Sequence, residues 1–357
     1  MSLFSSLFKS NDYLGVEIGT TTIKVIEIER TERQTRLKNY GILETYGYLE
    51  RFNNALQTSS LRAMESEISA YLGVVLQQAK IKTRVAIAAL QAFSGFTTLV
   101  ELPELDPEEV DQAMHFQIKQ YLPMPLSTVR TDYFKVGERT DEAGNKLHQF
   151  FLTAIPIGQI ERYQKIFKEA GLELKALELE GMSLARIFTA GVKDAQLIID
   201  IGARSTSFSV AQEGILKFQS QTDFAGSSLT QALASGMNFS PKRAEEIKKQ
   251  KGLLGVGGEY ELSTLMIPLL DVIINEANRA RENFERVYRQ QIRGIILAGG
   301  GSNLPGIEDY FTKQFNIKCV KGDPFAHLGF PKEILTLTKD LAPVFAVAIG
   351  ASLKEIQ

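Results

Sequence analysis

The sequence has few of the residues that build disulfides and metal centres. Its 357 residues include one cysteine, three histidines and no tryptophan. A single thiol, Cys319, cannot close an internal disulfide, which fits a protein that works in a reducing compartment. His115, His148 and His327 are scattered along the chain and form no metal-binding motif. The composition therefore excludes a disulfide-stapled scaffold and gives no support to a histidine metal centre.

Long apolar runs and a strong net charge are also missing. No stretch of about 18 residues is apolar throughout, so no membrane-spanning helix is expected. The 40 basic and 42 acidic side chains leave a net charge of −2, which does not favour a nucleic-acid partner. A cleavable signal peptide is not expected, because its charged and apolar regions are absent. Leu3, Phe4, Leu7 and Phe8 have helical spacing, which fits either a frayed terminus or a short helix that docks on a membrane surface or a partner.

Residues 14–25 predict a β-hairpin whose turn suits a phosphate group. An apolar strand ends in Glu17-Ile18-Gly19, and a second strand follows. Gly19 would let backbone N–H groups approach an anion, and Lys24 would add a positive charge. The turn also holds three hydroxyl donors: Thr20, Thr21 and Thr22. Glu17 suits a magnesium ion, held directly or through water, and a polar turn without a ligand is the alternative interpretation.

Two later stretches indicate that such a site is shared between two lobes. Residues 197–210 repeat the plan of strand, acid, Ile-Gly, small polar turn and strand, with Asp200 and Gly202 in the places of Glu17 and Gly19. Residues 294–307 form an apolar strand that opens into Gly299, Gly300, Gly301 and Ser302. Since 357 residues exceed what one compact core normally holds, we expect duplicated lobes that face one ligand.

Residues 91–155 predict a small strand–helix–strand–strand module, with strands at 96–102, 129–136 and 146–155. Its helix begins with Asp106 as the N-cap and Pro107 in the first position, and Pro123 and Pro125 would end it. Phe116 lies off the apolar stripe of this helix. The residues expected on the buried stripe are Val110, Ala113, Met114, Ile118 and Tyr121.

Apolar periodicity predicts the remaining elements. The expected strands lie within residues 38–48, 84–90 and 173–179. The expected helices lie at residues 66–79, 158–170, from 180, 225–234, from 241, 262–290 and 343–354. On the first of these helices, the residues expected on one buried face are Ile68, Tyr71, Leu72, Val75 and Leu76. Residues 252–258, with four glycines, predict a mobile loop.

In this order, the two hairpins and the glycine-rich loop resemble the actin-like ATPase superfamily, with its two phosphate hairpins and its adenosine loop. Residues 101–125, which begin Glu-Leu-Pro and end Pro-Met-Pro, and residues 342–350 resemble the type IV pilus assembly PilM family, relatives of the cell-division protein FtsA. The resemblance implies an α/β, actin-like two-lobe fold with an FtsA-type inserted small α+β subdomain (SHS2) in the first lobe. The implied divisions are a flexible segment at 1–11, a first-lobe core at 12–90 and 156–195 with 341–357 returning to it, the insert at 91–155, a second-lobe core at 196–224 and 262–340, and a second-lobe insertion at 225–261.

The resemblance also implies ATP and magnesium as cofactors and a role for each matching residue. The residues implied to bind the nucleotide are Gly19, Thr20, Thr21, Thr22, Lys24, Gly202, Ala203, Glu245, Lys248, Gly299, Gly300, Gly301 and Ser302. Of these, Lys248 and Glu245 would flank the base, although a solvated helix face is the alternative interpretation for both. The residues implied to hold magnesium, directly or through water, are Glu17, Glu180 and Asp200.

Two departures from the superfamily pattern bear on catalysis. The superfamily has Asp where Glu17 stands, and it has glycines where Ala203 and Arg204 stand. No residue stands out as the base that activates water, and Asp200 and Glu180 are the catalytic candidates. Because phosphoryl transfer depends on an in-line water, the sequence predicts nucleotide binding with at most weak ATP hydrolysis.

The leading interpretation is an ATP-binding cytoplasmic scaffold of the type IV pilus machine, peripheral to the inner membrane and involved in twitching motility. The resemblance implies that a groove between the first lobe and the insert binds the N-terminal cytoplasmic peptide of PilN, alongside other platform and motor proteins and possible self-association. The candidate groove residues are Phe116, Tyr121, Leu122 and Met124, and core packing is the alternative for all but Phe116. Other interpretations are an actin-like ATPase or small-molecule kinase with real turnover, or an FtsA-like membrane-associated filament, for which no C-terminal membrane helix is expected.

Overall fold

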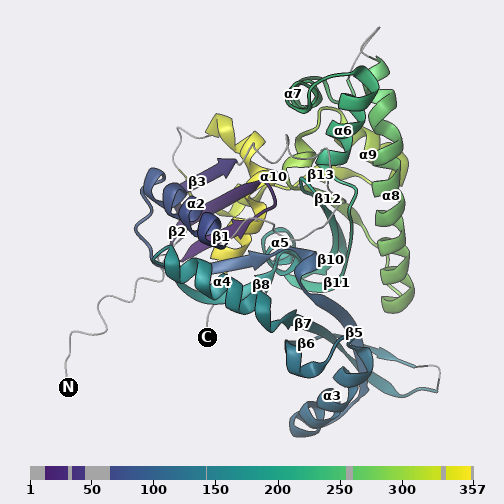
Figure 1. The fold of residues 1–357 in the computed structure, drawn as a ribbon. Coiled ribbons are helices and arrows are strands. Elements are labelled where there is room, and N and C mark those ends of the chain that lie inside the picture. The colour runs from purple at the N-terminus through teal and green to yellow at the C-terminus, as the bar shows by residue number, and fades with distance from the viewer. Residues whose placement is uncertain are drawn as a thin grey trace, which may run out of the picture.

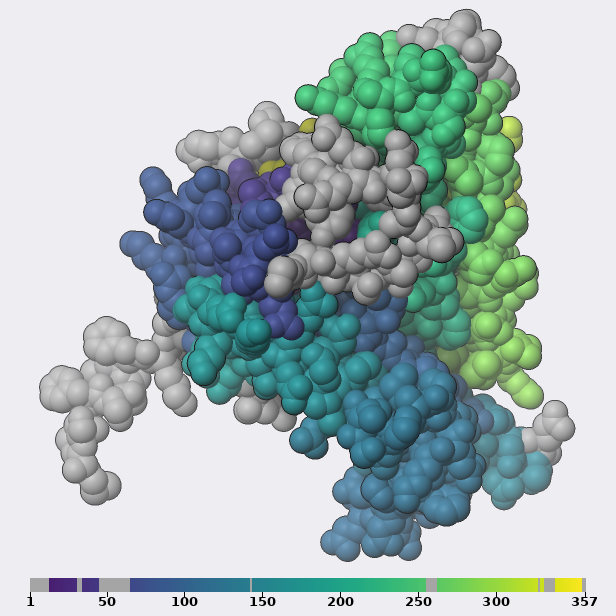
Figure 2. All heavy atoms as spheres, viewed as in Figure 1, coloured from purple at the N-terminus to yellow at the C-terminus, as the bar shows by residue number. Residues whose placement is uncertain are grey.

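The computed structural model describes residues 13–30, 34–44, 65–141, 143–254, 260–330 and 335–354. Two lobes lie side by side, and a smaller module projects below them (Figures 1 and 2). The predicted N-terminal segment, the end of the third strand at 45–48 and most of the glycine loop at 252–258 lie outside the described residues. Within those ranges, no helix has both the length and the apolar character needed to cross a bilayer.

The first lobe is built on a five-stranded sheet in the order β3-β2-β1-β4-β8. Its strands are β1 (Leu14–Ile18), β2 (Thr22–Arg30), β3 (Thr35–Glu44), β4 (Val85–Leu90) and β8 (Glu173–Leu179). The first three strands form an antiparallel meander, and β4 and β8 add in parallel to β1. Helices α2 (Glu65–Gln78) and α4 (Ile157–Glu169) pack on one face of this sheet.

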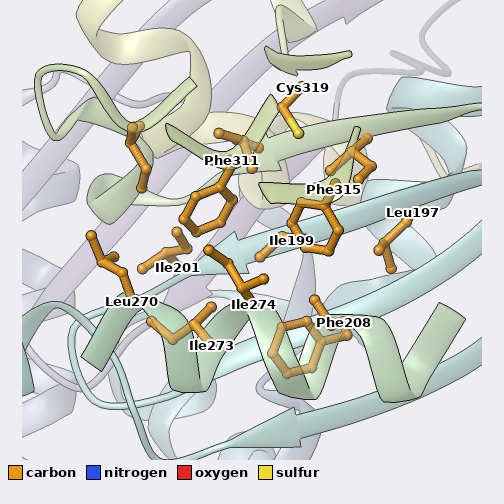
Figure 3. Close-up of a cluster of buried hydrophobic side chains, with 14 of the residues drawn as sticks. Leu197, Ile199, Ile201, Phe208, Leu270, Ile273, Ile274, Phe311, Phe315 and Cys319 are labelled. Atoms are coloured by element: carbon orange, nitrogen blue, oxygen red, sulfur yellow. The ribbon is translucent and has the colours of Figure 1, made fainter. Parts of the chain in front are cut away.

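The second lobe repeats this topology, with a sheet in the order β11-β10-β9-β12-β13. Its strands are β9 (Gln196–Ile201), β10 (Thr206–Gln212), β11 (Ile215–Thr222), β12 (Gly294–Ala298) and β13 (Cys319–Lys321). Its helices are α6 (Gly226–Met237), α7 (Pro241–Lys251), α8 (Tyr260–Tyr288) and α9 (Ile307–Phe315). As Figure 3 shows, Phe208 of β10, Ile274 of α8 and Phe311 of α9 share one core.

Two helices fill the space between the sheets: α5 (Glu180–Thr189) and α10 (Leu335–Ser352). They pack against buried residues of both lobes, including Ile87 of the first sheet and Ile198 of the second. The contacts are close, because a β-carbon on Gly15 would lie 1.9 Å from the carbonyl oxygen of Ala348. Strands β1 and β9 are therefore buried on both faces, as their mainly apolar sequences predict.

The inserted module has the predicted order of elements. Strands β5 (Phe96–Pro103), β6 (Val129–Thr140) and β7 (Lys146–Pro156) form a sheet in the order β5-β7-β6, and α3 (Pro107–Tyr121) packs on one face. Asp106 is the N-cap of α3, and its N–H donates to Glu109 at 3.3 Å. The short 3-10 turns of the chain are η2 (Ala92–Ser94), η3 (Leu126–Thr128), η5 (Gly300–Asn303) and η6 (Pro324–His327).

Three details of the sequence prediction were wrong. Tyr71 and Tyr121 were expected to be buried, but each is 41% exposed. Tyr71 lies at the margin of the apolar stripe of α2, and Tyr121 is the last residue of α3, beyond the core residue Ile118. The last helix begins at Leu335 rather than at Pro343. Proline inside a helix is unfavourable, but the apolar packing of Ala342 and Phe345 stabilises the helical turn around Pro343.

Candidate nucleotide site

A cleft of about 590 Å³ lies between the lobes, a volume typical of small-molecule sites. Nearly all of the predicted cofactor residues line it. These are Glu17, Gly19, Thr20, Thr21, Thr22, Lys24, Glu180, Asp200, Gly202, Ala203, Glu245, Lys248, Gly299, Gly300 and Gly301. The duplicated topology brings them together, because residues from both hairpins face the same space.

The two hairpin turns have the same backbone geometry. In the first, the N–H of Gly19 donates to the carbonyl oxygen of Thr22 at 2.8 Å. In the second, the N–H of Gly202 donates to the carbonyl oxygen of Ser205 at 3.0 Å. Equivalent turns from separate lobes can bind one ligand from two sides.

The glycine-rich loop closes a third side of the cleft. Gly299 has φ +76°, and a β-carbon there would lie 2.2 Å from Oδ1 of Asp200. A β-carbon on Gly301 would lie 2.3 Å from Cγ2 of Ile201, whereas one on Gly300 would meet nothing within 4 Å. Glycine is therefore needed at 299 and 301 so that the loop can lie against β9, and Gly300 leaves open space beside the cleft.

Ser302 is the one predicted nucleotide residue that does not line the cleft. Its side chain is fully buried, and its hydroxyl donates to the carbonyl oxygen of Gly299 at 2.7 Å. The loop is also tied to α10, since the N–H of Gly299 donates to the carbonyl oxygen of Pro343 at 2.8 Å and Asn303 donates to that of Asp340 at 2.7 Å. These bonds fix the glycine-rich loop to a helix that also packs on the first lobe.

Three buried acidic side chains, Glu17, Glu180 and Asp200, face the cleft. Burial raises the pKa of Glu180, and repulsion from Asp200 raises it further. Burial also raises the pKa of Asp200, and the charge of Glu17 adds to the effect. Lys24 donates to Oε1 of Glu17 at 2.6 Å, while Oε2 of Glu17 is buried with no hydrogen-bond partner. Three acids beside one paired lysine suit an added cation.

This donor set fits magnesium only in combination with a ligand. In the ranges that the structure describes, no three Asp, Glu, His or Cys residues form a ready-made metal site. Magnesium usually keeps several waters and takes one or two carboxylates together with substrate phosphates. Glu17, Glu180 and Asp200 therefore fit a magnesium ion that arrives with a phosphate-bearing ligand.

Lys248 and Glu245 are engaged with each other and with α6. The ammonium of Lys248 donates to the carbonyl oxygen of Gly226 at 2.8 Å and to the hydroxyl of Thr230 at 2.7 Å, and it lies 2.6 Å from Glu245. Burial lowers the pKa of Lys248. Burial is the largest influence on Glu245 and tends to raise its pKa, but the charge of Lys248 and the hydrogen bonds from Lys248 and Thr230 together lower it. The pair shapes the wall of the cleft and holds α7 against α6.

Sequence reasoning missed Gln91, which also lines the cleft. It follows β4 directly, as Glu180 follows β8, and β4 and β8 are parallel neighbours. The carboxyl ends of parallel strands meet at one edge of a sheet, where ligands commonly bind. The N–H of Ala92 donates to Oε1 of Glu180 at 3.1 Å, and Oε1 of Gln91 is buried without a partner. The position of Gln91 after a buried apolar strand was the available signal.

The candidate partner residues lie on α3 and in the segment that follows it. Phe116 is 63% exposed and Tyr121 is 41% exposed, whereas Leu122 and Met124 are half-buried. Leu122 packs on the core under α3, which matches its alternative interpretation. Phe116 and Tyr121 are thus the members of this set with large exposed apolar surfaces.

Comparison with known proteins identifies the family. Residues 15–356 match the family model described as type IV pilus assembly protein PilM. The chain belongs to the PilM family. It also superposes on a chain of a PilM-PilN type IV pilus biogenesis complex with a TM-score of 0.78 and 21% identity, covering 96% of this chain and 97% of that one.

More distant relatives confirm the actin-like fold. FtsA of Enterococcus hirae is 22% identical over 349 residues, which cover 87% of this chain and 77% of that protein. MreB 5 of Spiroplasma citri, in a structure bound to AMPPNP, superposes with a TM-score of 0.55 and 14% identity over 95% of this chain and 94% of that one. The predicted fold class and the predicted resemblance to PilM and FtsA are both confirmed. The domain boundaries and the roles of individual residues stay predictions.

Proposed function

We propose that this PilM-family protein is an ATP-binding scaffold that responds to nucleotide and binds the N-terminal cytoplasmic peptide of PilN. The observation that carries the nucleotide part is the interlobe cleft, where two equivalent glycine turns face three buried carboxylates. A phosphate group would find N–H and hydroxyl donors there, and a divalent cation would find hard oxygen ligands. Uncharged or purely apolar ligands would leave those carboxylates uncompensated.

Each side of the cleft has a distinct task in this proposal. The turn of residues 19–22 would bind phosphate oxygens from the first lobe, and Gly202 with Ala203 would bind them from the second. Magnesium would offset the charge of Glu17, Glu180 and Asp200. The open space beside Gly300 would accept the adenosine. Since the groups that bind one ligand belong to both lobes, ATP would stabilise one relative arrangement of those lobes.

We expect ATP turnover to be weak at most. One oxygen of Glu180 is already held by the N–H of Ala92, and the carboxylate of Glu17 is paired with Lys24. Neither is thereby oriented to activate an in-line water. A specific observation favours the alternative of real turnover: burial raises the pKa of Glu180, which would make it a better proton acceptor near neutral pH.

The partner part of the proposal rests on the inserted module. The similar structure is a PilM-PilN complex, and the similarity shows only that the fold is shared. The exposed ring of Phe116 on α3 offers apolar surface to a short peptide with apolar side chains. Through PilN, the protein would be cytoplasmic and peripheral to the inner membrane, in contact with other platform and motor proteins. Self-association is a further possibility of this assembly.

The deciding experiment measures binding of a labelled PilN N-terminal peptide by fluorescence anisotropy, with and without ATP and magnesium. ATP consumption is followed in the same samples. Saturable binding with negligible turnover supports the scaffold. No peptide binding, together with steady ATP loss that Asp200→Ala abolishes, would replace the scaffold by an actin-like ATPase or kinase.

A further inference from the structure

A second cleft, of about 570 Å³, lies between the inserted module and the second lobe. It shares no lining residue with the interlobe cleft. Its walls come from β5, β11 and the end of α8, together with Arg139 of β6, Phe151 of β7 and Tyr121 at the end of α3. The predicted PilN groove lies between the insert and the first lobe, so this cleft is a separate space, although Tyr121 is also a candidate residue of that groove.

Two unpaired strand edges border this cleft. Strand β5 is an edge of its three-stranded sheet, and β11 is an edge of the second-lobe sheet. Thr97, Thr98 and Leu99 of β5 line the cleft, and so do the consecutive residues 217–219 of β11. Successive side chains of a strand point to opposite faces, so three in a row line one cleft only where the strand edge itself borders it. In the part of the chain that the structure describes, no strand pairing joins these two edges.

The cleft is also positively charged. Arg286 and Arg289, at the end of α8, are exposed, and Lys217 of β11 also lines the cleft. Burial lowers the pKa of Lys217, whose ammonium lies 5.6 Å from the centre of the Tyr288 ring. The one acid of the lining, Glu101, is neutralised by Arg139, which donates to it through Nε at 2.6 Å. The remaining charges complement an acidic occupant.

We propose that this cleft binds an extended acidic peptide segment of a partner protein, which adds as a strand to the free edge of β5. Backbone hydrogen bonds would supply affinity, and Arg286, Arg289 and Lys217 would select acidic side chains. The inference is independent of the PilN groove, with which it shares only Tyr121.

The test uses a displayed library of random octapeptides. The library is selected on the full chain, and enrichment is compared with that on the double variant Arg286→Glu/Arg289→Glu. Arg279→Glu is the matched control, because Arg279 is an exposed arginine of the same helix outside the cleft. We expect the wild type and the control to enrich acidic peptides that the double variant binds about tenfold more weakly. Phe116→Ala should leave their binding unchanged.

Amide hydrogen exchange then tests the mode of binding with an enriched peptide. Amides of β5 at residues 97–101 should exchange more slowly in the complex, and a copy of the peptide N-methylated at alternate residues should bind weakly. Enrichment of neutral or basic peptides, equal enrichment on the double variant, or unchanged exchange at β5 would each overturn the proposal. A single-stranded DNA probe that binds in a manner sensitive to the double variant would assign the cleft to nucleic acid instead.

Discussion

Gly299 lies so close to Asp200 that its missing side chain is what allows the carboxylate to face the cleft. A β-carbon on residue 299 would lie 2.2 Å from Oδ1 of Asp200 and 2.5 Å from the carbonyl oxygen of Ile201. The backbone of Gly299, at φ 76° and ψ 166°, also lies in a region essentially restricted to glycine. The glycine-rich loop and the second hairpin thus form one unit.

Gly299→Ala should therefore damage both stability and nucleotide binding. The backbone conformation alone costs about 1–3 kcal/mol for a residue with a side chain, and the clash would displace Asp200. We expect a lower midpoint in urea denaturation and loss of ATP binding measured by calorimetry. Gly300→Ala is the control for stability, because a β-carbon at 300 meets nothing within 4 Å. Equal stability of the two variants would contradict this account.

The buried acids predict how stability depends on pH. The folded-state pKa values of Glu180 and Asp200 lie above the unfolded values. At pH values between the unfolded and the folded pKa, the folded state therefore binds more protons than the unfolded state. The free energy of unfolding without nucleotide or magnesium should then fall as pH rises from about 5 to 8, by up to about 1.4 kcal/mol per pH unit for each group.

Thermal melting across that pH range measures the effect. The double variant Glu180→Gln/Asp200→Asn should flatten the dependence, because neither amide titrates. Magnesium with ATP should restore stability to the wild type at the alkaline end. A wild-type curve as flat as that of the double variant would rule out this origin of the pH dependence.

Lys24→Met should be strongly destabilising. It would leave the carboxylate of Glu17 buried and unpaired, and breaking a buried ion pair on one side costs about 3–5 kcal/mol unless the acid becomes protonated. Adding Glu17→Gln should recover much of the loss. In chemical denaturation, Lys165→Ala is a suitable control, because its exposed pair with Glu65 should contribute nothing measurable. A loss for Lys24→Met no greater than for Lys165→Ala would show that the hairpin pair is not important for stability.

Phe116→Ala should weaken binding of the PilN peptide and leave stability unchanged. The ring is 63% exposed, so its removal leaves no cavity. Met114→Ala, on the buried face of the same helix, should instead cost about 2–5 kcal/mol in the free energy of unfolding. Anisotropy titrations and urea melts of both variants separate the two effects. If Phe116→Ala binds the peptide as tightly as the wild type, the binding surface does not include this face of α3.

The sequence by itself determined the elements whose signals are local. The two hairpins can be predicted because a glycine and small polar residues interrupt apolar strands. Helix α3 can be predicted because Asp106 and Pro107 mark its start. The ordered hairpins and loop also indicated the fold and the family. Even the Glu17–Lys24 pair could have been read from the hairpin, since the two residues face each other across β1 and β2.

Tertiary structure decided what depends on partners distant in sequence. Packing around Phe345 stabilises α10 as one continuous helix across Pro343. The hydroxyl of Ser302 forms a hydrogen bond within its own loop rather than facing the cleft. The burial that raises the pKa of Asp200 arises only when the lobes and α5 come together, and the second cleft forms only where the inserted module meets the second lobe. Local patterns fix which segments form strands and helices. Which side chains share one space depends on contacts that no short stretch of sequence contains.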